Sequence, residues 1–170
     1  MKTPQKLYAR YLKHLVPGRL EWIGLRPEHK QEMHEVDAAL ALQNQGLEGD
    51  HRCHKTPGSG RQITIISAEY IQQIEHFSGR RNIAPGLLRR NLVVSGINLG
   101  ALRHQQFAIG EAVLQANALC DPCSRMEQAL GPGGFAAMLG HGGLCAKIIH
   151  GGRIAVGDEV SLCTPQGELF

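Results

Sequence analysis

The chain has 170 residues, a length typical of one domain that buries roughly 70% of the surface exposed by its unfolded form. Charged residues make up 19% of the sequence, aromatic residues make up 5%, and the formal net charge is +3. This weak basic balance and the scarcity of aromatic rings argue against a protein that binds nucleic acid through a basic face or by base stacking.

The N-terminal segment, residues 1–18, is predicted to be a basic helical extension that ends at Pro17 and Gly18. Its charged side is expected to be solvated. It contains no apolar run long enough for a signal peptide or a membrane span, so we expect a cytoplasmic protein with no membrane role. One domain is expected over residues 19–165, followed by a short tail at residues 166–170.

Short strands dominate the expected domain. The first, residues 19–25, is predicted to carry Leu20, Trp22 and Gly24 on one side. Runs of apolar and β-branched residues, separated by glycine and proline, predict further strands. These are expected at residues 33–42, 61–66, 89–96, 107–109, 112–118, 144–149 and 153–162.

Two or three short helices are expected between the strands. Ser67 is predicted to cap one that runs to about Phe77, with Ile71, Ile74 and Phe77 facing the core. A further helical turn is expected within residues 133–139. Together with the 21 glycines, which favour tight turns, this pattern predicts a mostly β fold, a β-barrel with a few short helices.

The most informative segment reads Cys-Asp-Pro-Cys-Ser-Arg-Met-Glu at residues 120–127. Ser124 followed three residues later by Glu127 is typical of a capping box, so Ser124 is expected to cap a short helix. Cys123 would then lie just outside the helix N-terminus and close to the cation of Arg125. Both conditions favour a thiolate over a thiol. We therefore interpret Cys123 as a reactive sulfur rather than an inert buried cysteine.

Cys120 has two interpretations besides packing. It is a second catalytic thiol that resolves an oxidised Cys123 as a disulfide, or it is half of a zinc site completed by His51, Cys53 or His54. The usual second pair of zinc ligands is absent from the sequence. The odd number of five cysteines and the expected cytoplasmic location favour reduced thiols over structural disulfides.

Four arginines lie at loop and strand starts, in three segments that a barrel can bring together: Arg52, Arg61, Arg89 and Arg90. Their guanidinium groups suit a phosphate, such as that of a pterin cofactor, and also stabilise a thiolate or persulfide anion. The alternative is that they are solvated charges at strand ends.

Four further residues have a structural and a functional interpretation. Asp50 either orients an arginine or histidine or belongs to an ordinary turn. His141 is either an acid, base or cofactor contact or an exposed loop residue. Cys145 and Cys163 lie in predicted strands and are expected to be core residues.

Six segments occur together in one order: Gly-Leu-Glu-Gly-Asp at 46–50, Arg-Gln-Ile-Thr-Ile at 61–65, Arg-Arg-Asn-Leu-Val-Val-Ser-Gly at 89–96, the cysteine segment at 120–127, Gly-Gly at 142–143 and Gly-Gly-Arg-Ile-Ala-Val-Gly-Asp at 151–158. From about Leu20 to Leu162 the sequence thereby resembles the molybdenum-cofactor sulfurase C-terminal (MOSC) domain family. The resemblance implies a β-barrel fold and a signature cysteine, matched here by Cys123.

The resemblance also implies a function. Cys123 would receive sulfane sulfur as a persulfide and deliver it to a metal–sulfur or molybdenum cofactor. The donor would be a cysteine desulfurase, to which any pyridoxal phosphate would belong. Candidate cofactor-binding residues are Asp50, His51, Arg52, Arg61, Arg89, Arg90, Asn91, His141 and Gly143.

Two alternatives to the sulfur-carrier function stay open. In the first, Cys123 ligates the molybdenum of a cofactor, as in relatives that reduce N-hydroxylated bases. In the second, the chain is a zinc-stabilised interaction module without catalytic turnover. The enzyme class is therefore open between a sulfurtransferase, a molybdenum-dependent reductase and no enzyme.

Overall fold

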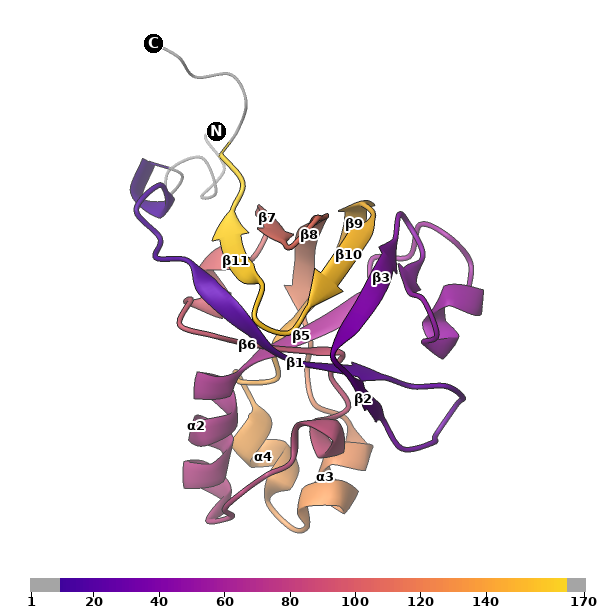
Figure 1. The fold of residues 1–170 in the computed structure, drawn as a ribbon. Coiled ribbons are helices and arrows are strands. Elements are labelled where there is room, and N and C mark those ends of the chain that lie inside the picture. The colour runs from indigo at the N-terminus through magenta and orange to yellow at the C-terminus, as the bar shows by residue number, and fades with distance from the viewer. Residues whose placement is uncertain (1–9, 165–170) are drawn as a thin grey trace, which may run out of the picture.

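The computed structural model describes residues 10–164 of the chain (Figure 1). The strands in this part are β1 Gly18–Leu25, β2 His34–Val36, β3 Ala38–Leu42, β4 Gly46–Leu47, β5 Ile63–Ser67, β6 Leu92–Ser95, β7 Gln106–Ile109, β8 Ala112–Leu119, β9 Leu144–His150, β10 Gly152–Ala155 and β11 Glu159–Leu162. The helices are α2 Ala68–Ser78, α3 Ser124–Leu130 and α4 Gly134–Met138, with the 3-10 turns η1 His51–His54, η2 Pro85–Leu88 and η3 Leu99–Leu102.

The strands form a closed barrel, which confirms the predicted mostly β fold. The main sheet has the order β11-β7-β8-β9-β5-β6-β1-β2, and β11 also pairs with β1. Seven of the described strands therefore close on themselves, and β2 extends beyond the closed part. All neighbours in this sheet run antiparallel except β5 and β6, which are parallel and joined through α2. The three α-helices lie together below the barrel in the view of Figure 1.

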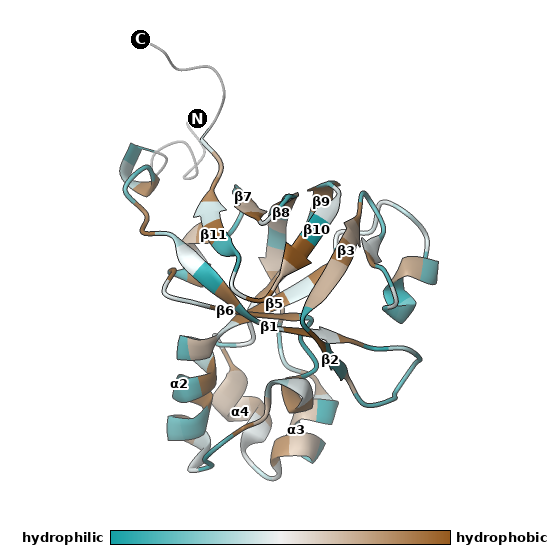
Figure 2. Cartoon of the chain, in the orientation of Figure 1, coloured by the Kyte–Doolittle hydropathy of each residue, from teal (hydrophilic) through white to brown (hydrophobic). Residues whose placement is uncertain are grey.

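Two hydrophobic cores follow from this arrangement. One fills the barrel, and the other lies between the barrel wall and the helices. Strand β5 serves both, because Ile63 and Ile65 point into the barrel while Ile66 packs among the helices. Figure 2 shows the hydrophobic residues gathered on the barrel strands and hydrophilic residues along α2.

The predicted side-chain pattern of the first strand was wrong. A β-bulge shifts the register between Leu20 and Trp22. Leu20 and Ile23 consequently face the barrel interior, while Trp22 packs in the second core. A bulge adds one residue to one strand of a pair, which exchanges the two faces beyond it.

Helix α2 confirms the predicted cap, and its last turn departs from the prediction. The Ser67 hydroxyl accepts a hydrogen bond from the Tyr70 amide at 3.1 Å, and Ile71 and Ile74 are buried. Phe77 is 57% exposed instead of facing the core. The end of α2 extends away from the barrel, so its last turn has no wall to pack against (Figure 1).

Two predicted strands are interrupted, and residues 46–52, for which no strand or helix was predicted, have regular structure. The expected strand 33–42 is divided into β2 and β3, and the expected strand 153–162 into β10 and β11. The glycine-rich loop of residues 46–52 contains β4 and the start of η1. Of the expected helical extension 1–18, residues 10–12 are helical, residues 13–17 form a turn and irregular structure, and Gly18 begins β1. Residues 1–9 lie outside the described residues, as do residues 166–170. Within residues 10–164, no helix has the length and apolar character needed to cross a membrane.

Candidate functional site

A row of buried polar residues crosses the outer wall of the barrel, on the side that faces the helices. Thr64 of β5 is paired with Cys145 of β9. Because Ile63 and Ile65 point into the barrel, alternation places Thr64 on the outer face. The Thr64 hydroxyl donates a hydrogen bond to the Asn91 side-chain oxygen at 3.1 Å. The row therefore runs from β9 across β5 to the start of β6.

An ion pair between Arg26 and Asp50 completes this row. The Arg26 Nε donates to Asp50 Oδ2 at 3.1 Å, and the side chains are 7% and 2% exposed. Asn91 joins them, because its Nδ2 donates to Asp50 Oδ2 at 2.9 Å and its Oδ1 accepts from Arg26 Nη2 at 3.0 Å. Burial alone would raise the pKa of Asp50, but Arg26 and the backbone amides of Arg26 and Arg52 lower that pKa below its ordinary value.

Asp50 therefore has both of the roles considered for it. Its carboxylate orients Arg26, and it caps η1 by accepting from the Arg52 amide at 3.0 Å. Sequence reasoning missed Arg26, which stands before Pro27 and directly follows the predicted strand 19–25. Its partner lies 24 residues away, so no local pattern links the two.

His51 and Arg52 follow Asp50 in η1, and each has a buried side-chain nitrogen without a hydrogen-bond partner in residues 10–164. The His51 Nδ1 is 3.6 Å from Asp50 Oδ1. Burial and Arg26 lower the pKa of His51 more than Asp50 raises it, which favours a neutral ring. Among the described residues, no hydrogen-bond partner reaches the buried His51 Nδ1 or Arg52 Nε. Buried polar atoms of this kind are rare in proteins and mark a place where a ligand or water completes the structure.

Helix α3 begins one residue earlier than predicted. Cys123 is its N-cap, without a side-chain cap bond, and Ser124 is the first helical residue. The predicted capping box was therefore wrong. The Glu127 carboxylate instead accepts hydrogen bonds from the amides of Gly133 and Phe135, at 2.9 and 2.7 Å. These amides at the start of α4 lie six and eight residues along the chain and take the carboxylate that a capping box would use.

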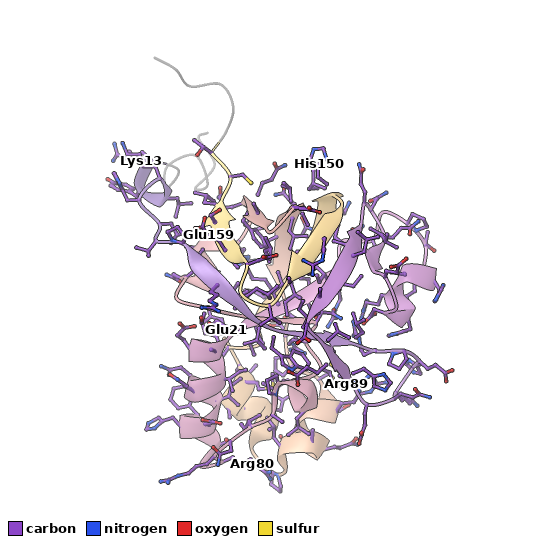
Figure 3. All side chains as sticks on the ribbon, in the orientation of Figure 1. Lys13, Glu21, Arg80, Arg89, His150 and Glu159 are labelled. Carbon is purple, nitrogen blue, oxygen red and sulfur yellow. The ribbon has the colours of Figure 1, made fainter. Side chains whose placement is uncertain are left out.

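Cys123 is the one exposed cysteine of the five, all of which lie in the described part of the chain. The Arg89 guanidinium is close enough to Cys123 and Arg125 for their charges to act on it: burial, Arg26 and Arg125 lower its pKa, and Cys123 raises it. Figure 3 shows Arg89 between β2 and the helices.

Two open hollows flank the start of α3. The first, of about 610 Å³, is cationic and is lined by Lys30, Arg89, Ser124, Arg125, Gln128 and Ala129. The second, of about 490 Å³, is mainly apolar and is lined by Ser124, Glu127, Gly133, Phe135 and Ala136. Ser124, which follows Cys123 in the chain, belongs to both. Lys30, in the loop before β2, carries no motif that would have marked it in the sequence.

Cys120 lies behind this surface and is 1% exposed. The Arg61 Nη2 donates a hydrogen bond to its sulfur at 3.3 Å. A hydrogen bond from the Cys145 thiol and the charges of Arg90 and Arg61 hold the pKa of Cys120 below the usual thiol range, despite its burial. The same hydrogen bond and burial raise the pKa of Cys145. Cys145, expected only as a core residue, is thus part of the site.

Arg90 holds in place the loop between β8 and α3, residues 120–123, which we call the cysteine loop. Its three guanidinium nitrogens donate to the carbonyls of Leu88, Cys120 and Gly142, at 2.9, 3.0 and 2.8 Å. With its donors aimed at carbonyl groups, Arg90 has a structural role rather than the predicted ligand-binding one. Gly143 is also structural, because a Cβ there would overlap the Ile65 carbonyl.

Two other sequence hypotheses find no support at this site. The His141 ring packs against Tyr70 and Phe77, with ring centroids 5.4 and 5.5 Å apart, and so is directed toward α2. Residues 10–164 contain no group of three or more histidine, cysteine or acidic side chains placed to hold a metal ion. The zinc hypothesis for Cys120 therefore lacks a ligand set, and Cys53, proposed as one ligand, donates its thiol to the Leu47 carbonyl at 2.6 Å.

The chain is similar to proteins of one known domain family, in sequence and in fold. The profile of the MOSC domain matches residues 45–161. The YuaD protein from Bacillus subtilis has a similar structure, with a TM-score of 0.74 and 22% identity, over 89% of this chain and 98% of YuaD. YiiM from Escherichia coli gives a TM-score of 0.64 at 20% identity, over 88% of this chain and 72% of YiiM.

YiiM from Geobacillus stearothermophilus is similar as well, with a TM-score of 0.68 and 18% identity, over 86% of this chain and 75% of that protein. At these identities the structural likenesses establish the fold. A comparison with curated proteins gave no significant match.

Proposed function

Because the chain belongs to the MOSC domain family, we propose that it is a sulfur carrier in which Cys123 receives sulfane sulfur as a persulfide. The acceptor would be a metal–sulfur or molybdenum cofactor. The observation that carries this proposal is the exposed sulfur of Cys123 beside Arg125 and Arg89, while Cys120 and Cys145 are buried. A carrier sulfur has to meet both a donor and an acceptor, so exposure is its first requirement.

The transfer step is an exchange between sulfur atoms. The Cys123 thiolate attacks the outer sulfur of a donor persulfide, R–S–SH. A new S–S bond forms on Cys123, the S–S bond of the donor breaks, and the donor leaves as the thiolate R–S⁻. No net oxidation or reduction occurs, and the product is Cys123–S–SH.

The cations around Cys123 favour each anion in this exchange. Arg125 is exposed, and Arg89 is partly buried with its Nη1 bound to the Gln31 carbonyl at 2.7 Å. Nearby positive charge stabilises the attacking thiolate and the bound persulfide anion. The open form of the cationic hollow suits a docked protein donor, and we propose a cytoplasmic cysteine desulfurase, which would carry the pyridoxal phosphate.

The test is the mass of the intact protein after incubation with a cysteine desulfurase and cysteine. A gain of one sulfur, removed by a thiol reductant and absent from Cys123→Ser, supports the proposal. Cys163→Ser is a matched control because it also removes one thiol, and it should gain sulfur normally. No added sulfur, or added sulfur that persists in Cys123→Ser, would overturn the proposal.

A second candidate is binding of the molybdenum cofactor itself, favoured by the cationic hollow beside Cys123 and by the unpartnered His51 Nδ1. The donor set fits this cofactor, since thiolate is a soft ligand and guanidinium groups suit a phosphate. Cys123 would ligate the metal, and Arg89 and Arg125 would bind the phosphate. The cofactor would supply redox chemistry for reducing N-hydroxylated bases.

Elemental analysis of protein produced in a host that makes the cofactor separates the two candidates. Stoichiometric molybdenum that is lost in Cys123→Ser supports cofactor binding. Protein that gains sulfur but contains no molybdenum supports the carrier function alone.

A further inference from the structure

The proposed transfer step uses Cys123 alone and leaves the sulfur atoms of Cys120 and Cys145 without a role. Cys120 and Cys145 are 1% and 4% exposed, and both lie at the site rather than in either apolar core. Cys120 follows the last residue of β8, and Cys145 is the second residue of β9. Two buried thiols beside charged and polar groups can react, whereas cysteines packed in an apolar core are generally inert.

The strand register brings the two sulfur atoms to one face. Ala118 is paired with Cys145 and Leu119 with Leu144, so Cys120 comes next along this edge, opposite Gly143, to which its amide donates at 2.8 Å. Residues two positions apart across a ladder lie on the same side of the sheet. The Cys145 thiol also lies 3.9 Å from the Leu119 carbonyl, beside the residue that precedes Cys120.

The surroundings of Cys120 favour its ionised form. The Arg61 Nη2 is 3.3 Å from its sulfur, and Arg90 holds its carbonyl at 3.0 Å. Arg61 is itself an exposed residue, and Cys120 is 1% exposed, so oxidation of its sulfur requires a small reagent and a local movement of the side chains around it. A thiolate beside a thiol is the arrangement in which an oxidised sulfur is captured by its neighbour.

We propose that Cys120 and Cys145 form a redox-active dithiol, a modification site at which a peroxide converts two thiols to a disulfide. The Cys120 thiolate attacks one oxygen of hydrogen peroxide, the O–O bond breaks, and hydroxide leaves and takes up a proton. The Cys120 sulfenic acid then condenses with the Cys145 thiol, the S–S bond forms, and water leaves. In sum, two thiols and one hydrogen peroxide give one disulfide and two water molecules.

This pair works independently of Cys123. Its disulfide would join the end of β8 to β9 and remove the sulfur anion to which Arg61 donates. The cysteine loop begins at this junction, so oxidation would change the support of Cys123 without consuming its sulfur. The inference therefore stands whether or not Cys123 carries sulfane sulfur.

The test uses the full chain with Cys123→Ser, which removes the exposed thiol and leaves the buried pair. Reduced protein is treated with hydrogen peroxide, free thiols are blocked with N-ethylmaleimide, and the tryptic peptides are mapped without reduction. The expected product links peptide 104–125, which contains Cys120, to peptide 126–147, which contains Cys145. A disulfide between Cys120 and any other cysteine overturns the proposal. It is also overturned if, after peroxide treatment and denaturation, the Cys145 thiol still reacts completely with N-ethylmaleimide.

Two substitutions sharpen the result. Arg61→Gln removes the cation on the Cys120 sulfur and should slow formation of the disulfide several-fold, whereas the exposed Arg81→Gln should leave the rate unchanged. In Cys145→Ser, Cys120 should progress to sulfinic acid because its partner is gone. Equal rates in the two arginine variants, or a Cys120 untouched by peroxide in Cys145→Ser, would contradict the assignment.

Discussion

Arg26 and Asp50, 24 residues apart in the chain, form a buried ion pair that Asn91 locks from both sides. It joins the end of β1 to the start of η1 and forms one end of the polar row beneath the site. Because both side chains are shielded from water, removing one partner leaves an unpaired buried charge and should cost more stability than breaking a surface ion pair.

Substitution of Asp50 by asparagine should reduce the free energy of unfolding by about 3–5 kcal/mol, because the Arg26 charge stays buried without its counterion. Urea unfolding followed by circular dichroism measures the change. Asp121→Asn, at an exposed position, is the matched control and should change stability by less than about 0.5 kcal/mol. A variant of Asp50 as stable as the control would show that the ion pair is dispensable.

The same carboxylate should make the protein sensitive to acid. The pKa of Asp50 is lower in the folded chain than in the unfolded one, so its stabilising contribution is complete above the unfolded value of about 4 and is lost as the pH falls through the folded value. Unfolding free energies measured from pH 6 to pH 2.5 should therefore fall more steeply for the natural chain than for Asp50→Asn. Parallel curves would assign the acid sensitivity to other groups.

Loss of the Arg90 clamp should loosen the cysteine loop. Arg90→Met keeps much of the side-chain volume but leaves three buried carbonyls without their donor, at a cost of about 2–4 kcal/mol. Hydrogen exchange should also accelerate in residues 119–124 and 140–143 while the far side of the barrel stays protected. Uniform loss of protection would indicate global destabilisation instead of a local clamp.

The cations around Cys123 should govern its reaction rate. The double substitution of Arg89 and Arg125 by glutamine should slow alkylation of Cys123 by iodoacetamide at pH 7 several-fold, because it removes the two arginine cations from the hollow at the start of α3. Added salt should slow the natural protein more than the variant, because it screens the same charges. Arg80 and Arg81, both exposed on the loop after α2, provide a double-glutamine control.

The sequence predicts the barrel well because its strands depend on local properties. The β-branched run ending at Ile66 and the Ser67 cap determine β5 and α2 within a short window. The bulge between Leu20 and Trp22 depends on pairing with distant β6 and cannot be read from residue alternation.

The residues of the candidate site also fall into those that a local sequence pattern marks and those that depend on distant contacts. Cys123 and Cys120 stand out through their own motif. Of the four candidate arginines, Arg61 donates to the Cys120 sulfur, and Arg89 is close enough to Cys123 for the charge of that sulfur to raise the pKa of Arg89. Arg26 and Cys145 have no local signature, because Arg26 acquires its role from Asp50, 24 residues away, and Cys145 from pairing with the distant strand β5. Glu127 was misassigned because the amides that it binds belong to the next helix.

Closure of the barrel depends on the pairing of Gly18 with Val160 and of Arg19 with Glu159. During synthesis, this edge of β1 stays unpaired until β11 has left the ribosome. The hairpin of β7 and β8, in contrast, can form as soon as both strands have emerged. Deletion of β11 would therefore leave β1 and β7 as open edges able to pair with other copies of the chain, and the truncated product should aggregate.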